Sequence, residues 1–312
     1  MTNESEVNVI SVSGGKDSTA MLLLAIERGT ENIRPVFCDT GNEHGITYEY
    51  VHYLEKATGV PIEWVKADFS ADIARKRQVV ETKWRADGIP EETVQAALSV
   101  LHPTGNPFLD LCLYHGRFPS TKVRFCTFEL KADVLKNHVH APHLQKGIDV
   151  VSWQGVRRDE SPARACAVER DLAMTDAKTG AELWNYRPIL DWSAQDCFDM
   201  MRRHGIKPNP LYLQGMGRVG CMPCINVRKD ELREIANRFP EEIERIAQWE
   251  AIVRKAGRTG KSSFFAHADG HGDGIHAVVE WSRTARGGRQ MDIFGTGEHE
   301  PTQCSSKYGL CE

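Results

Sequence analysis

The first residues able to do chemistry form a short loop near the start of the chain, Ser-Gly-Gly-Lys-Asp-Ser at positions 13–18. Two adjacent glycines let a phosphate approach the backbone, Lys16 adds a positive charge, and the flanking serines add hydroxyl donors. The loop joins an apolar, β-branched run to an apolar helical pattern, and a helix N-terminus favours anions. The glycine spacing and the Asp17 that follows Lys16 exclude a Walker A loop. An ordinary strand-to-helix turn is the alternative, and we interpret the segment as a phosphate-binding loop.

Two carboxylates follow the next apolar run, residues 33–38. Asp39 and Glu43 lie where a second strand is expected to end, beside the phosphate-binding loop. There they would hold a ribose hydroxyl or a Mg²⁺ ion that bridges phosphates. Loop-capping carboxylates are the alternative interpretation.

Arginines crowd the end of a later apolar run, residues 148–153. Gly155 follows this run, and Arg157, Arg158 and Arg164 come close behind it. Guanidinium groups at the carboxyl end of a strand suit a phosphate or sulfate that is held bidentately. Surface arginines are the alternative, and the position favours anion binding.

The chain contains nine cysteines, and two of them form the pattern Cys221-Met-Pro-Cys224 in a glycine-punctuated loop. Such a pair serves a zinc ion, an iron–sulfur cluster or a redox dithiol, and the spacing alone does not separate the three. Cys126, Cys304 and Cys311 are further candidate ligands. The others are interpreted as core-filling residues: Cys38, Cys112, Cys166 and Cys197.

The elements that must position these residues alternate between strand and helix patterns through the first two hundred residues. This alternation predicts an α/β fold, a doubly wound parallel sheet whose ligands sit at the carboxyl ends of the strands. Strands are expected at residues 7–10, 33–38, 61–66, 148–153 and 184–190. The expected domains are a nucleotide-binding unit over residues 1–208, with an insertion or lid at 72–122, and a helical, cysteine-bearing extension over 209–312.

Composition places few further limits on function. Hydrophobic residues make up 41% of the 312, and the net charge of −4 gives no whole-protein attraction to nucleic acid or to an anionic membrane. No apolar run reaches the roughly 20 residues that span a bilayer, and the polar start of the sequence is not that of a signal peptide. We therefore expect a cytoplasmic protein with reduced thiols and no membrane partner.

With these residues in place, residues 7–225 resemble the phosphoadenosine phosphosulfate (PAPS) reductase family. The matching segments are 13–18, Asp39-Thr-Gly41, 125–131, 155–161, 187–192 and 220–224. The resemblance implies the Rossmann-like fold of the PP-loop adenine nucleotide α-hydrolases. It also implies a [4Fe–4S] cluster held by Cys126, Cys221, Cys224 and a fourth cysteine, Cys311 or, less favoured, Cys304, with zinc as the alternative metal. Phe125 stands where cluster-bearing relatives have a further cysteine.

Three functions follow from the resemblance. The preferred one is an ATP-dependent enzyme that binds ATP–Mg²⁺, cleaves the α–β bond and adenylates an acceptor for sulfur insertion, because the intact loop is similar to that of ATP-using relatives. The second is a thiol-dependent reductase of an adenylyl sulfate, although the expected C-terminal motif is replaced by Tyr308-Gly-Leu-Cys311. The third is a redox-sensing, nucleotide-binding subunit without catalysis.

The residues expected to carry these functions form three sets. The catalytic set is Lys16, Asp17, Arg157, Arg158 and Cys311. The nucleotide-binding set is Ser13, Gly14, Gly15, Lys16, Asp17, Ser18, Asp39, Gly155 and Arg157. The metal-binding set is Cys126, Cys221, Cys224 and Cys311. The expected partners are a sulfur donor protein such as a cysteine desulfurase, or thioredoxin, a nucleic-acid acceptor and a second copy of the chain.

Overall fold

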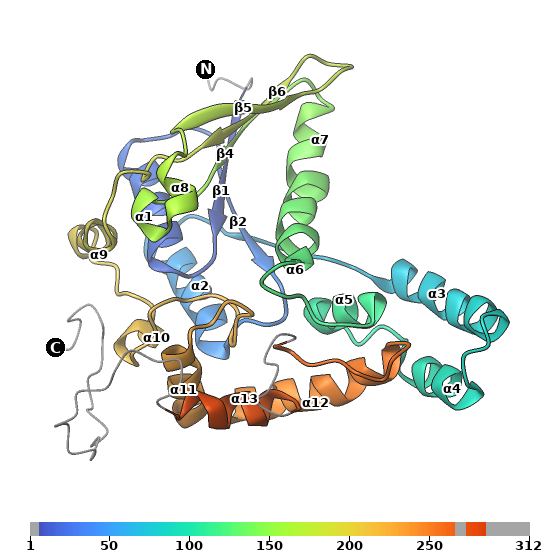
Figure 1. Ribbon diagram of the computed structural model, residues 1–312. Helices are drawn as coiled ribbons and strands as arrows, with labels where there is room; N and C mark the ends of the chain where they lie inside the picture. Colours follow the sequence, from blue (N-terminus) through green and yellow to red (C-terminus); the bar gives the residue numbers. More distant parts are fainter. Residues whose placement is uncertain (1–5, 266–272, 285–312) are drawn as a thin grey trace, which may run out of the picture.

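A six-stranded sheet forms the centre of the computed structural model, which describes residues 6–265 and 273–284 (Figure 1). The strand order is β3-β2-β1-β4-β6-β5, and every neighbouring pair is parallel except β5 with β6. The strands are β1 (Glu6–Val12), β2 (Ile33–Asp39), β3 (Glu63–Lys66), β4 (Asp149–Trp153), β5 (Arg170–Thr175) and β6 (Glu182–Tyr186). The predicted α/β fold with a mainly parallel sheet is confirmed.

Helices cover both faces of this sheet. On one face, the helices α1 (Lys16–Glu27), α2 (Gly45–Thr58) and α9 (Ala194–Arg203) bury one apolar cluster, and on the other face the helical segment that ends in α7 (Ala141–Leu144) buries a second. The central strand β1 serves both: Val7 and Val9 lie in the second cluster, and Ile10 and Val12 lie in the first. This period of two is what a strand buried on both faces requires.

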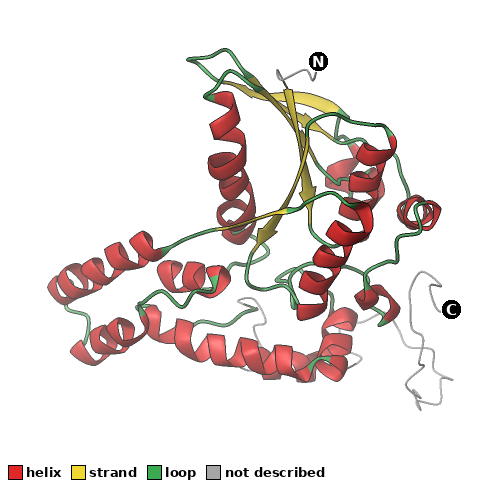
Figure 2. Cartoon of the chain, turned by 180° about the vertical axis from the view of Figure 1, so that it is seen from behind, coloured by secondary structure: helices red, strands yellow, loops and turns green. Residues whose placement is uncertain are grey.

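A second, helical half contains the largest apolar cluster. The segment predicted as an insertion or lid forms α3 (Ser70–Val79), the π-helical turn η1 (Val80–Trp84), α4 (Glu91–Val100) and α5 (Pro107–His115). These elements pack against the later helices α11 (Lys229–Arg238), α12 (Pro240–Ala256) and α13 (Ile275–Ser282), and both groups share one core. Figure 2 shows this helical layer lying beyond one end of the sheet. The 72–122 segment and the helices α11 to α13 therefore share one hydrophobic core.

Short helical elements complete the chain. They are α6 (Phe125–Thr127), η2 (Phe128–Ala132), η3 (Leu135–His140), η4 (Arg158–Glu160), α8 (Pro162–Ala165) and α10 (Pro210–Leu213). No helix in the described part of the chain is both long enough and apolar enough to cross a membrane.

Two details of the sheet differ from the sequence-based expectations. The last strand was expected to reach residue 190, but β6 ends at Tyr186 because Pro188 has no amide hydrogen with which to continue a ladder. The antiparallel edge strand β5 was not predicted, since Arg170–Thr175 is mostly exposed and has no alternating apolar pattern. Its conformation follows from its pairing with β6.

Candidate functional site

The phosphate-binding loop connects β1 to α1 at the carboxyl end of the central strand. Its two serines are hydrogen-bonded to each other: the Ser13 amide donates to Ser18 Oγ at 3.0 Å, and the two hydroxyl oxygens lie 3.1 Å apart. Gly15 is the N-cap of α1 and provides no capping side chain. Within residues 6–265 and 273–284, the amides of Gly14 and Gly15 make no hydrogen bond. The loop thus presents unsatisfied N–H donors at the positive end of a helix.

The backbone of this loop is tightly enclosed. Gly14 has φ +73°, and a Cβ atom there would lie 2.9 Å from Thr47 Cγ2. Two residues of the α10 segment bond to the backbone of the loop. Asn209 Nδ2 donates to the Gly14 carbonyl at 3.1 Å, and the Lys16 amide donates to the Tyr212 hydroxyl at 2.9 Å. Glycine is therefore required at position 14 for both conformation and space.

The charged groups of the loop form a buried network. Arg157 Nε donates to Asp17 Oδ1 at 2.6 Å, and Lys16 Nζ lies 3.4 Å from Asp17 Oδ2. Arg157 is 4% exposed and Lys16 6%. Burial alone would lower the pKa of the Arg157 guanidinium, but the Asp17 and Asp159 carboxylates hold it above its ordinary value. A permanent positive charge therefore lies next to the phosphate-binding loop.

Two further arginines interact with this network. Burial and the nearby charge of Arg218 lower the pKa of Arg164, and Arg157 acts on it in the same direction. Guanidinium groups that repel one another beside a glycine-rich loop favour a polyvalent anion as their common partner. Arg158 points elsewhere, since its side chain is bonded to Asp191 and to the Ala167 carbonyl. Gly155 packs on the loop, where a Cβ would lie 3.4 Å from Ser18 N.

The loop after β2 holds two carboxylates in a second network. Asp39 Oδ1 accepts from the Gly41 amide at 2.9 Å and from the Tyr48 hydroxyl at 2.8 Å. Glu43 is 7% exposed and accepts from the Thr40 hydroxyl at 2.7 Å. Burial, then the charge of Glu43 and the bond to Asp39, raise the pKa of Tyr48, so this phenol stays protonated and keeps donating.

The cysteine pair lies against the same loop. The Cys221 thiol donates to Glu43 Oε1 at 3.7 Å, and the Met222 amide donates to the Asn42 carbonyl at 2.8 Å. Burial, then the Glu43 charge, raise the pKa of Cys221 to about 12. The segment carrying Cys221 and Cys224 is therefore docked on the end of β2, within reach of the acidic network.

Cys126 joins this group from a different element, α6. Burial and then the charge of Cys224 raise the pKa of Cys126. Burial alone would lower the pKa of the Lys131 ammonium, but its interactions with Cys221, Glu43, Cys38 and Cys224 hold this pKa above the ordinary value. Cys126, Cys221 and Cys224 therefore lie near Lys131, and thiol side chains are the usual ligands of an iron–sulfur cluster.

The remaining cysteines are distributed differently. Cys311 and Cys304 lie outside the described residues. Among the described residues, no three His, Cys, Asp or Glu side chains are arranged to hold a single metal ion. Cys112 and Cys197 are buried, as a core-filling role requires, and Cys38 is half-buried. For Cys166 the core-filling interpretation is wrong, because this thiol is exposed at the end of α8.

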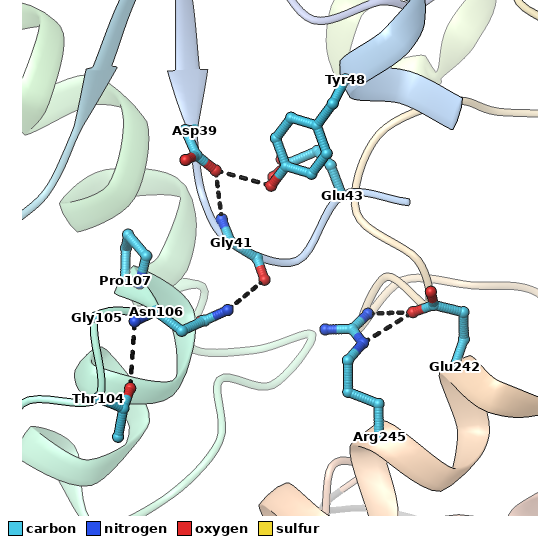
Figure 3. A pocket seen from close by; sticks show the side chains of 10 residues that line it. All are labelled: Asp39, Gly41, Glu43, Tyr48, Thr104, Gly105, Asn106, Pro107, Glu242 and Arg245. Carbon is cyan, nitrogen blue, oxygen red and sulfur yellow. Dashed lines mark hydrogen bonds and ion pairs between the residues drawn. The ribbon is translucent and has the colours of Figure 1, made fainter. Parts of the chain in front are cut away.

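A cavity of about 540 Å³ opens between the end of β2 and the helical half. Figure 3 shows Asp39 and Tyr48 on one side, the 104–107 turn on another, and Glu242 with Arg245 on a third. Asn106 ties two walls together, because it caps α5 and its Nδ2 donates to the Gly41 carbonyl at 2.7 Å. A Cβ atom at Gly41 would lie 2.8 Å from this amide.

The structure brings most of the nucleotide-binding set together around one loop: residues 13–18, Gly155 and Arg157. Asp39 instead lines the cavity at the end of the neighbouring strand. Sequence reasoning missed Asn209, Tyr212 and Arg218, and no motif marks them. An asparagine followed by a proline, at 209–210, is an N-cap signal that would have placed α10 but not its contact with the loop.

Comparisons with known proteins give a family match over most of the chain and a relative that is similar over nearly its whole length. The family model described as the phosphoadenosine phosphosulfate reductase domain matches residues 7–227. A relative from Escherichia phage 186, described as an uncharacterized 37.8 kDa protein in the gpa 5′ region, is 46% identical over 99% of this chain and 98% of its own length.

Two further similarities are more limited. Adenosine 5′-phosphosulfate reductase of Allochromatium vinosum is 37% identical over 70 residues, which cover 22% of this chain and 25% of that enzyme. A solved structure of phosphoadenylyl-sulfate reductase from Candida auris, a phosphate complex, aligns with 70% of this chain and 82% of its own, at 13% identity and a TM-score of 0.39.

Proposed function

Since this chain belongs to the phosphoadenosine phosphosulfate reductase domain family, we propose that it is an ATP-dependent enzyme that adenylates an acceptor for sulfur insertion. The observation that carries the proposal is the loop at 13–18, with two unbonded amides, Lys16 and the buried Arg157 around it. This arrangement suits the triphosphate of ATP, whose β- and γ-phosphates need both amide donors and fixed positive charge.

In this proposal an oxygen of the acceptor attacks the α-phosphorus of ATP. The bond from that phosphorus to the α–β bridging oxygen breaks, and pyrophosphate leaves with the electron pair. Lys16 and Arg157 neutralise the charge that builds up on the leaving group, while Asp17 keeps both cations in place through its two carboxylate oxygens. Mg²⁺ would accompany the phosphates. Arg158 is bonded to Asp191, so we assign it to the support of its loop.

A [4Fe–4S] cluster would be held by Cys126, Cys221 and Cys224, with Cys311 as the proposed fourth ligand. When bound, it supplies electron-transfer or sulfur-handling chemistry. In this proposal, the chain contributes three thiols near the Lys131 ammonium, with Cys221 in contact with Glu43 after β2. A sulfur donor protein, such as a cysteine desulfurase, is the partner that this reaction requires.

The test is to incubate anaerobically purified protein with ATP and Mg²⁺, with and without candidate sulfur acceptors, and to follow pyrophosphate and the adenylyl group, both as free AMP and as adenylated acceptor. Pyrophosphate equal to the sum of free AMP and adenylated acceptor, lost in Lys16→Gln, is expected. ADP with inorganic phosphate, or no turnover with any acceptor, would refute α–β cleavage.

Reduction of an adenylyl sulfate is the second candidate, favoured by the 70-residue similarity to an adenosine 5′-phosphosulfate reductase. The same preparation is therefore given adenylyl sulfates and reduced thioredoxin, and sulfite is measured. Sulfite release that disappears in Cys311→Ser, without pyrophosphate release from ATP, would establish this alternative instead.

A further inference from the structure

An exposed aromatic ring lies close to Cys126, on the helical segment that begins with α6 (Figure 1). Phe128 is 61% exposed, the highest fraction among the large apolar side chains in the part of the chain that the structure describes, and Val123 is 46% exposed. Neither side chain belongs to any of the three hydrophobic clusters. A single exposed apolar residue is ordinary on a protein surface, and the surroundings of Phe128 are what distinguish it.

The start of this helical segment is fixed to α5, so Phe128 faces solvent. The Phe125 ring is buried and stacks on His115, with the ring centres 4.0 Å apart. Glu129 Oε1 lies 2.8 Å from Nε2 of the same histidine. Arg124 lies four residues before Phe128, and residues at this spacing are neighbours on a helical surface. An exposed guanidinium and an exposed ring therefore share one side of the segment.

The cations around Phe128 have no acidic partners. Arg117, Lys122 and Arg124 are exposed, and none of them forms an ion pair with any residue that the structure describes. The Arg124 Nε donates to the Thr121 carbonyl at 3.2 Å, and the Arg117 guanidinium lies 5.8 Å from the centre of the Phe125 ring. These residues form what we call the 117–128 surface: Arg117, Lys122, Val123, Arg124 and Phe128. Its local charge is positive although the net charge of the chain is −4.

Unpaired cations beside an exposed aromatic ring are suited to single-stranded nucleic acid. The cations contact phosphates, and the face of the ring stacks on an unpaired base, whichever base it is. A duplex keeps its bases stacked inside and offers the ring no partner. A protein interface of standard size has a desolvated apolar core and few lysines, whereas the apolar part here is one ring and one valine. The observations therefore favour a nucleic-acid strand over an acidic protein.

The location of the 117–128 surface relates it to the cysteines and separates it from the phosphate-binding loop. Cys126, two residues before Phe128, is half-buried, and it packs with Cys224 against the same hydrophobic cluster. None of residues 13–18 or 155–157 belongs to the surface. A strand bound here would thus leave the nucleotide site open and lie beside the proposed cluster ligands.

We propose that the 117–128 surface binds single-stranded nucleic acid, with one base stacked on the Phe128 ring and the phosphates held by Arg117, Lys122 and Arg124. The binding does not depend on the proposed function, whereas the role of the bound strand as the sulfur acceptor rests on it.

The test is the fluorescence anisotropy of labelled oligothymidylate and oligouridylate of about 15 nucleotides, titrated with the full-length protein. Saturating α,β-methylene-ATP is present, so that the oligonucleotide phosphates cannot occupy the phosphate-binding loop. Binding is expected, and three phosphate contacts imply that it weakens roughly twentyfold between about 50 mM and about 200 mM salt. A difference between the two strands identifies DNA or RNA as the ligand, since only RNA has the 2′-hydroxyl.

Variants of Phe128 test the stacking contact. Phe128→Leu keeps an apolar side chain but removes the aromatic face, so the affinity for oligothymidylate should fall at least about tenfold. Phe128→Trp should retain it. Leu172→Ala, a truncation of a 45% exposed side chain on β5, is the control and should bind like the wild type.

A paired substitution tests the phosphate contacts. Lys122→Gln combined with Arg124→Gln should reduce the slope of log affinity against log salt by about 1.4, because two contacts are lost. Arg202→Gln combined with Arg203→Gln removes the same charge from the exposed side of α9 and should leave the slope unchanged.

Wild-type measurements decide the inference even if a variant folds poorly. It is wrong if neither strand binds at low salt, if a duplex of the same length binds as tightly, or if the strand binds only when the ATP analogue is absent. Poly-glutamate is the polyanion without bases, and equal binding of it would indicate an acidic protein as the partner instead. Equal affinity of Phe128→Leu and the wild type would also contradict the stacking contact.

These outcomes are distinct from those for the proposed function. Absence of strand binding in a protein that binds the ATP analogue and releases pyrophosphate would overturn this inference alone. Strand binding that depends on Phe128 in a protein that binds no ATP analogue would keep the 117–128 surface and remove the proposed ATP chemistry.

Discussion

His140, at the end of η3, gives the structure a measurable pH dependence far from the phosphate-binding loop. It is 7% exposed, and its Nε2 has no hydrogen-bond partner among the described residues. Burial, followed by the charges of His143 and Arg34, lowers its pKa from 6.5 to about 4. The folded protein therefore holds this imidazole neutral at a pH at which the unfolded chain protonates it.

The sign and size of the effect follow from linkage. Between about pH 6.5 and pH 4 the unfolded state binds one proton more than the folded state, so the free energy of unfolding falls as the pH falls. Above pH 6.5, the pKa of this imidazole in the unfolded chain, His140 no longer lowers the free energy of unfolding. From about pH 7.5 to about pH 5, this single group should cost about 2 kcal/mol of stability.

The assay is urea unfolding of the wild type and two variants at both pH values. His140→Leu should lose less stability on acidification than the wild type, by about 2 kcal/mol. His138→Leu is the control, because His138 lies on the same segment and is exposed, and it should follow the wild type. If wild type and His140→Leu lose equal stability, or if the imidazole titrates near 6.5 by NMR, the burial argument is wrong.

Three further predictions concern the site. Arg157→Gln should lower the free energy of unfolding by about 2 kcal/mol in urea, since it removes the shorter of the two cation contacts of the half-buried Asp17 and leaves only Lys16; a cost below about 0.5 kcal/mol would contradict this. Gly14→Ala should abolish ATP binding in calorimetry and cost about 1–3 kcal/mol of stability, because of φ +73° and the approach to Thr47. Cys224→Ser should remove most of the iron from anaerobically purified protein while ATP affinity is kept, whereas the exposed Cys166→Ser should retain the iron.

The sequence predicted those parts of the fold that depend on local pattern. The strand before the phosphate-binding loop lies where it was expected, because a run of apolar, β-branched residues acts within a few positions. Ser193 caps α9 and Pro240 opens α12 through equally local effects, a capping hydroxyl and a proline in the first turn. The need for glycine at position 14 also follows from local backbone conformation, since its φ is positive.

Contacts between distant segments could not be predicted in this way. Tyr212 bonds to the Lys16 amide across 196 residues, and Arg245 on α12 bonds to Asn42 across 203. Neither partner carries a motif, since a phenol or a guanidinium is an ordinary residue until the fold brings it to its position. For the same reason an insertion or lid was expected at 72–122, but the packing of its helices on α12 was not.

The two polar regions at the carboxyl end of the sheet differ in charge, and this difference bears on how a reaction between two substrates would be arranged. Lys16, Arg157 and Arg164 surround the loop at the ends of β1 and β4, whereas Asp39 and Glu43 lie at the end of the adjacent β2. A triphosphate placed at the second region, or an amine at the first, would face like charges. Charge alone therefore favours an anionic ligand at the phosphate-binding loop and disfavours it at the end of β2.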